Sequence, residues 1–372
     1  MKANPNARIR DHADVHILFN VLVTLITLVI GYQIFSILGL VTKTVPYSIT
    51  SHFCLDTRSL ALGRICLGIL VMTDILQSRW PLRHLFYTDN GFWPRKLVLS
   101  GNDPQINSKH DLSFYMSFGS DFWISTLFII TFIAGGCVLV GYWTQTSLLI
   151  CWLHTYSLTY RGSGIHQAGD TLLRLLLFWC TFLPCGNHLS IDMYVNNTSR
   201  DHEILSLASF AVLVQMSMLY VFPAAFKASL PWKNGDAIKL VLTNYAFAQN
   251  SFVTNILLSN VLYMKGLTYI TPIVEHSAPI MLLFVPFRLL GVVIFSCFHT
   301  GLAMTMRLGL FPFVSITKFT SFNFPEMTMS NLVYIVLFLL SSWPPFEGVH
   351  YWMGYINTKR FLGFSWLGRR WE

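Results

Sequence analysis

Residues 122–142 read FWISTLFIITFIAGGCVLVGY, a run of 21 residues without a charged side chain. As an α-helix rising 1.5 Å per residue, this run would be about 30 Å long, which is the thickness of the hydrocarbon core of a bilayer. A second uncharged run of 23 residues covers Ile204–Phe226. Because backbone polar groups inside a bilayer must be hydrogen-bonded within the protein, both runs predict membrane-spanning helices.

The composition of the whole chain supports a membrane protein. Of its 372 residues, 53% are hydrophobic and 11% are charged, whereas a soluble domain has about 25% charged residues. This excludes an ordinary soluble enzyme, and the abundance of apolar residues excludes a disordered chain. The net charge of +8 is spread over loops and tails, which indicates contact with anionic membrane lipids rather than with nucleic acid. The seven cysteines include no CxxC motif and predict neither a disulfide framework nor a metal site.

Further apolar segments extend the pattern along the chain. The segments are 17–40, 59–73, 146–160, 170–183, 252–264, 267–274, 277–306, 308–317 and 332–346. Together they predict an all-α, polytopic membrane bundle of about eight to ten transmembrane helices. We divide it into an N-terminal tail with an extra helix (1–55), a membrane core (56–350) and a basic, aromatic tail (351–372). Helix parity places loops 77–121 and 161–169 and the stretch after Lys227 on one side.

Ionisable residues at membrane depth are the strongest candidates for function, because they are costly in lipid and usually face the bundle interior or a wet cavity. Asp170 and Arg174 are four residues apart, so we expect them to pair on one helical face. Arg64 either anchors a neighbouring helix or lines a cavity. Lys227 follows an apolar helix directly. It either reaches the lipid headgroups or turns into a cavity, where a desolvated amine can act as a general base.

Two histidines complete the set of candidates. His166 lies in the glycine-rich loop 161–169, on the predicted side of Lys227; it is either an ordinary surface residue or part of a site. His299 lies in an apolar segment and is either a catalytic residue or a hydrogen-bonding residue between helices.

Several stretches resemble the membrane domain of the vitamin K-dependent gamma-glutamyl carboxylase family and the wider horizontally transferred transmembrane (HTTM) family. They are Ser59–Arg64 with Gly68 and Asp74, Tyr87–Pro94, Gly169–Phe178, Gln215–Lys227 and Phe298–His299. They occur in the family's order between about residues 56 and 320.

The resemblance implies a catalytic role for Lys227 as the base that deprotonates reduced vitamin K or a related quinol. In that family, reaction with oxygen then gives a strongly basic epoxide species, which removes a gamma proton from a glutamyl peptide before carbon dioxide adds. His299 matches a functionally important histidine, and His166 lies three residues from the position of the family's loop histidine. The resemblance also leads us to predict a cofactor-binding role for Arg64, Asp170, Arg174 and Tyr220.

The chain departs from the carboxylases in three respects. Phe226 replaces the first lysine of the family's Lys-Lys pair, Gly169 stands at the position of the loop histidine, and we expect the large C-terminal lumenal domain to be absent. The alternatives to a carboxylase-like enzyme are a non-catalytic HTTM scaffold and a transporter of lipids or small molecules. If the protein is eukaryotic, the resemblance favours the endoplasmic reticulum, with loop 77–121 in the lumen. The positive-inside rule favours the opposite orientation, in which the sequons at Asn196 and Asn197 would face the lumen.

Overall fold

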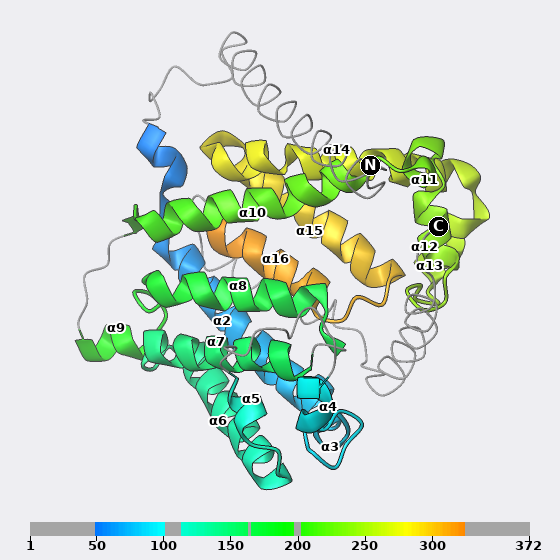
Figure 1. The fold of residues 1–372 in the computed structure, drawn as a ribbon. Helices are drawn as coiled ribbons and strands as arrows, with labels where there is room; N and C mark the ends of the chain where they lie inside the picture. Colours follow the sequence, from blue (N-terminus) through cyan, green and yellow to red (C-terminus); the bar gives the residue numbers. More distant parts are fainter. Residues whose placement is uncertain (1–48, 101–112, 163–164, 197–201, 324–372) are drawn as a thin grey trace, which may run out of the picture. The chain divides into compact units, whose positions relative to one another are not determined.

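The computed structural model describes residues 49–100, 113–162, 165–196 and 202–323 (Figure 1). Most of these residues are helical, and the two strands, β1 (Leu55–Asp56) and β2 (Glu203–Ile204), have two residues each. The predicted all-α class is confirmed. The predicted helices 17–40 and 332–346 and the tail 351–372 lie outside the described residues.

Four helical stretches of the described residues are long and apolar enough to cross a membrane. They are Thr57–Arg79, Asp121–Val140, Leu207–Phe226 and Val285–Thr305. Other helices of the bundle fall short of this standard; the helix over segment 170–183, for example, has 15 residues and is about 22 Å long. The predicted total of about eight to ten helices therefore includes shorter helices of the bundle as well as helices that are long and apolar enough for a full crossing.

The chain divides into two compact units, each described by itself. Of the described residues, unit 1 contains Ile49–Leu55, Glu203–Phe295 and Asn323, and unit 2 contains those within Asp56–His202 and Ser296–Phe322. Helix α15 (Arg288–Thr305) contributes residues to both units.

Unit 2 contains the uncharged run 122–142, which forms most of α6. Its helices are α2 (Thr57–Thr73), the π-helical continuation η2 (Asp74–Arg79), α3 (Arg83–Phe86), α4 (Arg95–Ser100), α5 (Phe114–Ser117), α6 (Asp121–Val140), α7 (Thr144–Arg161), α8 (Ala168–Phe182), α9 (Ile191–Asn196) and most of α16 (Phe311–Asn323). Helix α2 packs against α6, and α7 packs against both α6 and α8.

Glycine permits the close approach of α2 and α6. A Cβ atom placed on Gly68 would lie 2.7 Å from the backbone nitrogen of Leu139 and 2.9 Å from the carbonyl oxygen of Gly135. Gly135 in turn lies against the side chains of Met72 and Val71. Small residues at a helix interface let the backbones pack closely, which is a common basis of helix association in membranes.

A tight turn reverses the chain between α6 and α7. Gly141 ends α6 in the left-handed region at φ 71°, a conformation that glycine adopts without steric cost. The carboxylate of Asp192 accepts hydrogen bonds from the backbone nitrogens of Trp143 and Thr144, at 2.9 and 2.8 Å. It thereby holds the start of α7 to the segment that contains α9.

Unit 1 is built mainly from two long helices, α10 and α14. Its elements are η1 (Ile49–Phe53), α10 (Leu207–Phe226), α11 (Leu230–Asn234), α12 (Ala237–Thr243), α13 (Phe252–Ser259), α14 (Val261–Leu283), η4 (Val285–Phe287) and the first part of α15. Helix α10 begins with a capping box at Ser206, which satisfies free backbone N–H groups. Segment 267–274, predicted as a separate run, belongs to the continuous helix α14, which also contains Pro272 and Pro279.

Candidate functional site

Lys227 forms a buried ion pair in unit 1. It is the C-terminal cap of α10, and its Nζ lies 2.5 Å from Oε2 of Glu275 on α14. The two side chains are 16% and 10% exposed. The pair agrees with the alternative in which Lys227 turns inward, since a lysine that reaches for headgroups would leave its amine in the interface.

An aromatic ring lies close to the amine of Lys227. Its Nζ lies 5.4 Å from the ring centroid of Trp232, a distance at which a cation is attracted by the face of an indole ring. Tyr220 lies two helical turns before Lys227 and is buried, with its ring 4.8 Å from that of Phe295. Phe226 is 61% exposed. The Lys227–Glu275 pair is therefore a polar group in a largely apolar setting.

Asp170 does not pair with Arg174, which corrects the prediction from their spacing. Its Oδ1 instead pairs with Nη2 of Arg79, and its Oδ2 accepts a hydrogen bond from the backbone nitrogen of Gln167 at 2.9 Å. Asp170 is thus the third residue of α8, and it forms the capping box of this helix together with Gln167. A partner 91 residues away in sequence competes successfully with the local one, because the capping geometry already directs this carboxylate toward the start of the helix.

Arg174 points to α7. Its Nη1 donates to the hydroxyl of Thr159 at 3.2 Å, and its guanidinium lies 6.0 Å from the ring centroid of Tyr156. These contacts connect α8 to α7, the helix that precedes it in the chain and packs against it.

Arg64 has the contacts of a helix anchor, one of the two alternatives that its position left open. Its guanidinium donates to four backbone carbonyls, at distances between 2.5 and 3.1 Å, namely those of Val138, Leu139, Cys185 and Leu189. The first two belong to the last turn of α6, where the partial negative charge of the helix end favours a cation. The whole residue has no exposed surface. Arg64 therefore connects three segments of unit 2.

His166 lies at the α8 N-terminus, and His299 is connected to it through Phe311. His166 lies 2.7 Å from the hydroxyl of Thr171 through Nε2, and 3.5 Å from Oδ2 of Asp170 through Nδ1. His299 is buried, and its ring lies 5.5 Å from that of Phe311. Phe311 also contacts α8, because a Cβ on Gly169 would lie 2.9 Å from the Phe311 backbone nitrogen.

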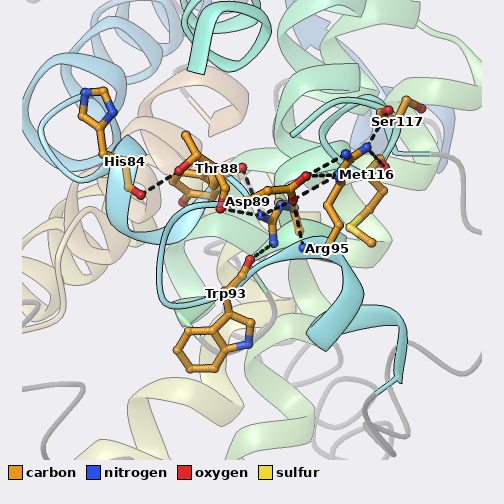
Figure 2. A network of polar contacts seen from close by, with 9 residues as sticks. His84, Thr88, Asp89, Trp93, Arg95, Met116 and Ser117 are labelled. Atoms are coloured by element: carbon orange, nitrogen blue, oxygen red, sulfur yellow. Dashed lines mark hydrogen bonds and ion pairs between the residues drawn. The ribbon is translucent and has the colours of Figure 1, made fainter. Parts of the chain in front are cut away.

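A clamp of polar contacts fixes the loop that resembles the HTTM family (Figure 2). Asp89 pairs with Arg95 at 2.6 Å, and Arg95 donates to the carbonyl oxygen of Ser117 at 2.8 Å. The hydrogen bonds from Arg95 hold the pKa of Asp89 below its usual value. Arg161 at the end of α7 donates to the carbonyls of Thr88 and Trp93. The loop is therefore attached to the end of α7.

The loop clamp positions a buried tyrosine beside Arg79. Arg161 also donates to the carbonyl oxygen of Tyr87 at 3.1 Å, and the Tyr87 hydroxyl accepts from Nη1 of Arg79 at 2.9 Å. Nε of Arg79 donates to both oxygens of Asp74, at 3.2 and 3.1 Å. Arg79 is thus the centre of an acidic cluster formed by Asp74, Arg79 and Asp170.

The predicted site residues fall into two groups, according to their unit. Lys227 and Tyr220 belong to unit 1, and the remaining five belong to unit 2: Arg64, His166, Asp170, Arg174 and His299. Sequence reasoning missed Glu275, the partner of Lys227, although a lone carboxylate between apolar runs is itself a signal of a buried partner. It also assigned no role to Arg79, because nothing local connects this residue to Asp170.

Comparison with known proteins agrees with the resemblance seen in the sequence. No solved structure matches the chain. The family model of the HTTM domain matches residues 54–326, which include the buried pair of unit 1 and the acidic cluster and loop clamp of unit 2. With this match over most of its length, the chain belongs to the HTTM domain family.

Proposed function

We propose that this membrane protein is an enzyme of the carboxylase type, in which Lys227 is the general base toward a bound quinol. The observation that carries the proposal is the buried contact between Lys227 and Glu275, at 2.5 Å. A lysine held in a largely apolar setting by a carboxylate can lose its proton within the pair. The amine then becomes a base without a proton having to leave the protein.

The surroundings of Lys227 fit a quinol. Trp232 offers a ring face beside the amine, and apolar walls with few polar groups are typical of small-molecule sites. A quinol hydroxyl that donates to Nζ would be held in place by the amine and by stacking on the Trp232 ring. Together with oxygen, a bound quinol would supply the strong base that is needed to deprotonate a glutamyl side chain.

Each residue of the pair has a distinct role in this proposal. Lys227 accepts the hydroxyl proton of the quinol at Nζ. Glu275 orients the amine and holds the proton that the amine gives up within the pair. Once the quinol proton has reached Nζ, Glu275 releases its own proton to water, which restores the starting pair of ammonium and carboxylate. Overall, quinol, oxygen, carbon dioxide and a glutamyl peptide would give the quinone epoxide, water and a gamma-carboxylated peptide. The carboxylase resemblance also favours a location in the endoplasmic reticulum of a eukaryotic cell.

The test is to replace Lys227 by arginine in the full-length protein, reconstituted in lipid nanodiscs with reduced vitamin K. Arginine can still pair with Glu275, but its guanidinium does not lose a proton near neutral pH. We therefore expect nearly unchanged thermal stability and a fall in epoxide formation on the order of 100-fold or more. Lys233→Arg on α11 is the matched control, because Lys233 is exposed, and it should keep the wild-type rate.

Two outcomes would contradict the proposal. If Lys227→Arg forms epoxide at the wild-type rate, Lys227 is not the base. If the wild-type protein forms no epoxide with reduced vitamin K or related quinols, the buried pair is a structural contact. The alternative of a non-catalytic HTTM scaffold then explains the chain better than an enzyme does.

A further inference from the structure

The acidic cluster of unit 2 contains an excess of negative charge. Asp74 and Asp170 contribute two carboxylates, whereas Arg79, which contacts both, contributes one guanidinium. Their side chains are 8%, 17% and 7% exposed. If both carboxylates are ionised, the cluster holds one uncompensated negative charge in a buried setting, which is strongly unfavourable.

The neighbouring titratable groups do not supply the missing positive charge. Tyr87 donates or accepts a hydrogen bond as a neutral phenol. Tyr115 on α5 bonds to Nδ1 of His154 on α7 at 2.8 Å. His154 lies among aromatic rings, with Phe128 at 5.4 Å, and such a setting disfavours an imidazolium ion. Arg174 on α8 points to Thr159 rather than to the cluster.

The buried arginine at the end of α7 is also engaged elsewhere. Arg161 donates to carbonyl oxygens of the loop clamp and lies 3.9 Å from Asp89. Asp89 has its own closer partner, Arg95. The guanidinium of Arg161 is therefore used to hold the loop. Among the residues that the structure describes, the remaining group that can bring a positive charge to the cluster is His166, whose Nδ1 lies 3.5 Å from Asp170.

A small cavity adjoins the cluster. It has a volume of about 10 Å³, and its polar lining consists of Asp74, Arg79, Thr155, Thr159, His166 and Asp170. This is about the room that one water molecule requires, and the polar lining offers the partners that such a water needs. The side chain of His166 is 22% exposed, so it connects the cavity wall with the outside of unit 2.

We propose that Asp74 and Asp170 form a proton-binding site that holds one proton at neutral pH, and that His166 transfers this proton to and from the cavity. The proton cancels the excess charge, and Arg79 orients both carboxylates. A metal ion fits this site less well, because the fixed positive charge of Arg79 already lies between the carboxylates. The proposal is independent of the proposed lysine chemistry, because all of its residues belong to unit 2.

The direct test is infrared spectroscopy of the full-length protein in nanodiscs, with ¹³C label in the aspartate carboxyl groups. We expect a carbonyl band of a protonated aspartic acid in the wild type between about pH 6 and 8, where ordinary aspartates are ionised. The band should shift with the label and vanish in Asp74→Asn. Asp121→Asn is the matched control, because Asp121 is a half-exposed surface aspartate, and it should keep the band.

The role of His166 has its own measurement. His166→Gln can still hydrogen-bond to Thr171, but it cannot carry a proton in exchange. After a jump to high pH, we expect the band to disappear on the order of tenfold or more slowly in this variant. An equal rate in the wild type and the variant would refute the transfer role of His166.

The dependence of stability on pH gives a second readout of proton binding. A folded state that holds a proton which the unfolded chain has lost becomes less stable as pH rises, by tenfold in the folding constant per pH unit for one proton. Asp74→Asn has no such proton to hold and should lose this slope. Absence of the protonated band in the wild type, or its persistence in both Asp74→Asn and Asp170→Asn, would overturn the proposal.

Discussion

Replacing Arg64 by methionine tests whether this residue anchors the fold of unit 2 or binds a cofactor. Methionine removes four hydrogen bonds from a charged donor to backbone carbonyls. Such bonds contribute about 1.5–3 kcal/mol each when measured singly. The four share one side chain, so their contributions do not add. We therefore expect a loss of about 3–5 kcal/mol, which corresponds to about two such bonds rather than four.

Thermal unfolding of the full-length protein in nanodiscs, followed by tryptophan fluorescence, measures this loss. For a domain of 150–250 residues, about 2–4 °C in Tm corresponds to 1 kcal/mol, so the expected fall is about 6–20 °C. Arg58→Met on the same helix is the matched control. The Arg58 side chain is 34% exposed in its pair with Asp56, and such a pair contributes about 0–1 kcal/mol.

The result that would refute the anchor is specific. If Arg64→Met lowers Tm no more than Arg58→Met does, the four carbonyl contacts contribute little to stability. If the same variant also loses binding of a quinol, Arg64 is a cofactor-binding residue, as the family resemblance implied.

Three further predictions concern other parts of unit 2. Gly68→Ala should cost about 1–3 kcal/mol by overpacking the helix interface, whereas Gly136→Ala should cost little, since no described atom lies within 4 Å of its Cβ position; chemical denaturation compares the two. Hydrogen bonds from Arg95 hold the pKa of Asp89 below its usual value, so this contact should stabilise the fold fully above the usual aspartate pKa and lose its effect as pH falls through the folded value, which acid titration against Asp89→Asn will show. Asp170→Ala should destabilise by about 1–3 kcal/mol more than Arg174→Ala, because it breaks a helix cap and a buried ion pair; a similar loss in both would argue that the two residues act as a pair.

Hydropathy predicts the membrane helices of this chain because their length is fixed by the bilayer rather than by tertiary contacts. The run that became α6 was identifiable from its 21 uncharged residues alone. The break between runs 252–264 and 267–274 was misplaced, because the two helices separate at Asn260 and α14 continues through Lys265 and Gly266. A helix inside a bundle tolerates a charged residue when a neighbouring element covers it or its end reaches water.

Partners in the candidate sites were harder to predict, because sequence spacing reveals only local ones. The i,i+4 spacing predicted a pair between Asp170 and Arg174. This spacing shows only that two side chains can reach each other, and not which partner each of them prefers. The capping role of Asp170 turned its carboxylate toward Arg79, which lies 91 positions earlier. Likewise, the inward direction of Lys227 depends on Glu275, 48 positions later. Such long-range pairs follow from tertiary packing, which no local pattern encodes.

The two buried ionic groups should respond in opposite ways to the removal of one charge. Lys227 and Glu275 sum to zero, so replacing either by a neutral residue leaves its partner buried and uncompensated, at a cost of about 3–5 kcal/mol. The acidic cluster sums to one negative charge when it is fully ionised, so Asp74→Asn removes the excess instead of creating one. The asparagine amide also has nearly the shape of the protonated acid. A neutral substitution should therefore destabilise unit 1 at every pH, whereas in unit 2 it should be best tolerated at high pH, where the wild-type cluster has lost its proton. This difference separates a pair that exchanges a proton internally from a site that takes its proton from outside.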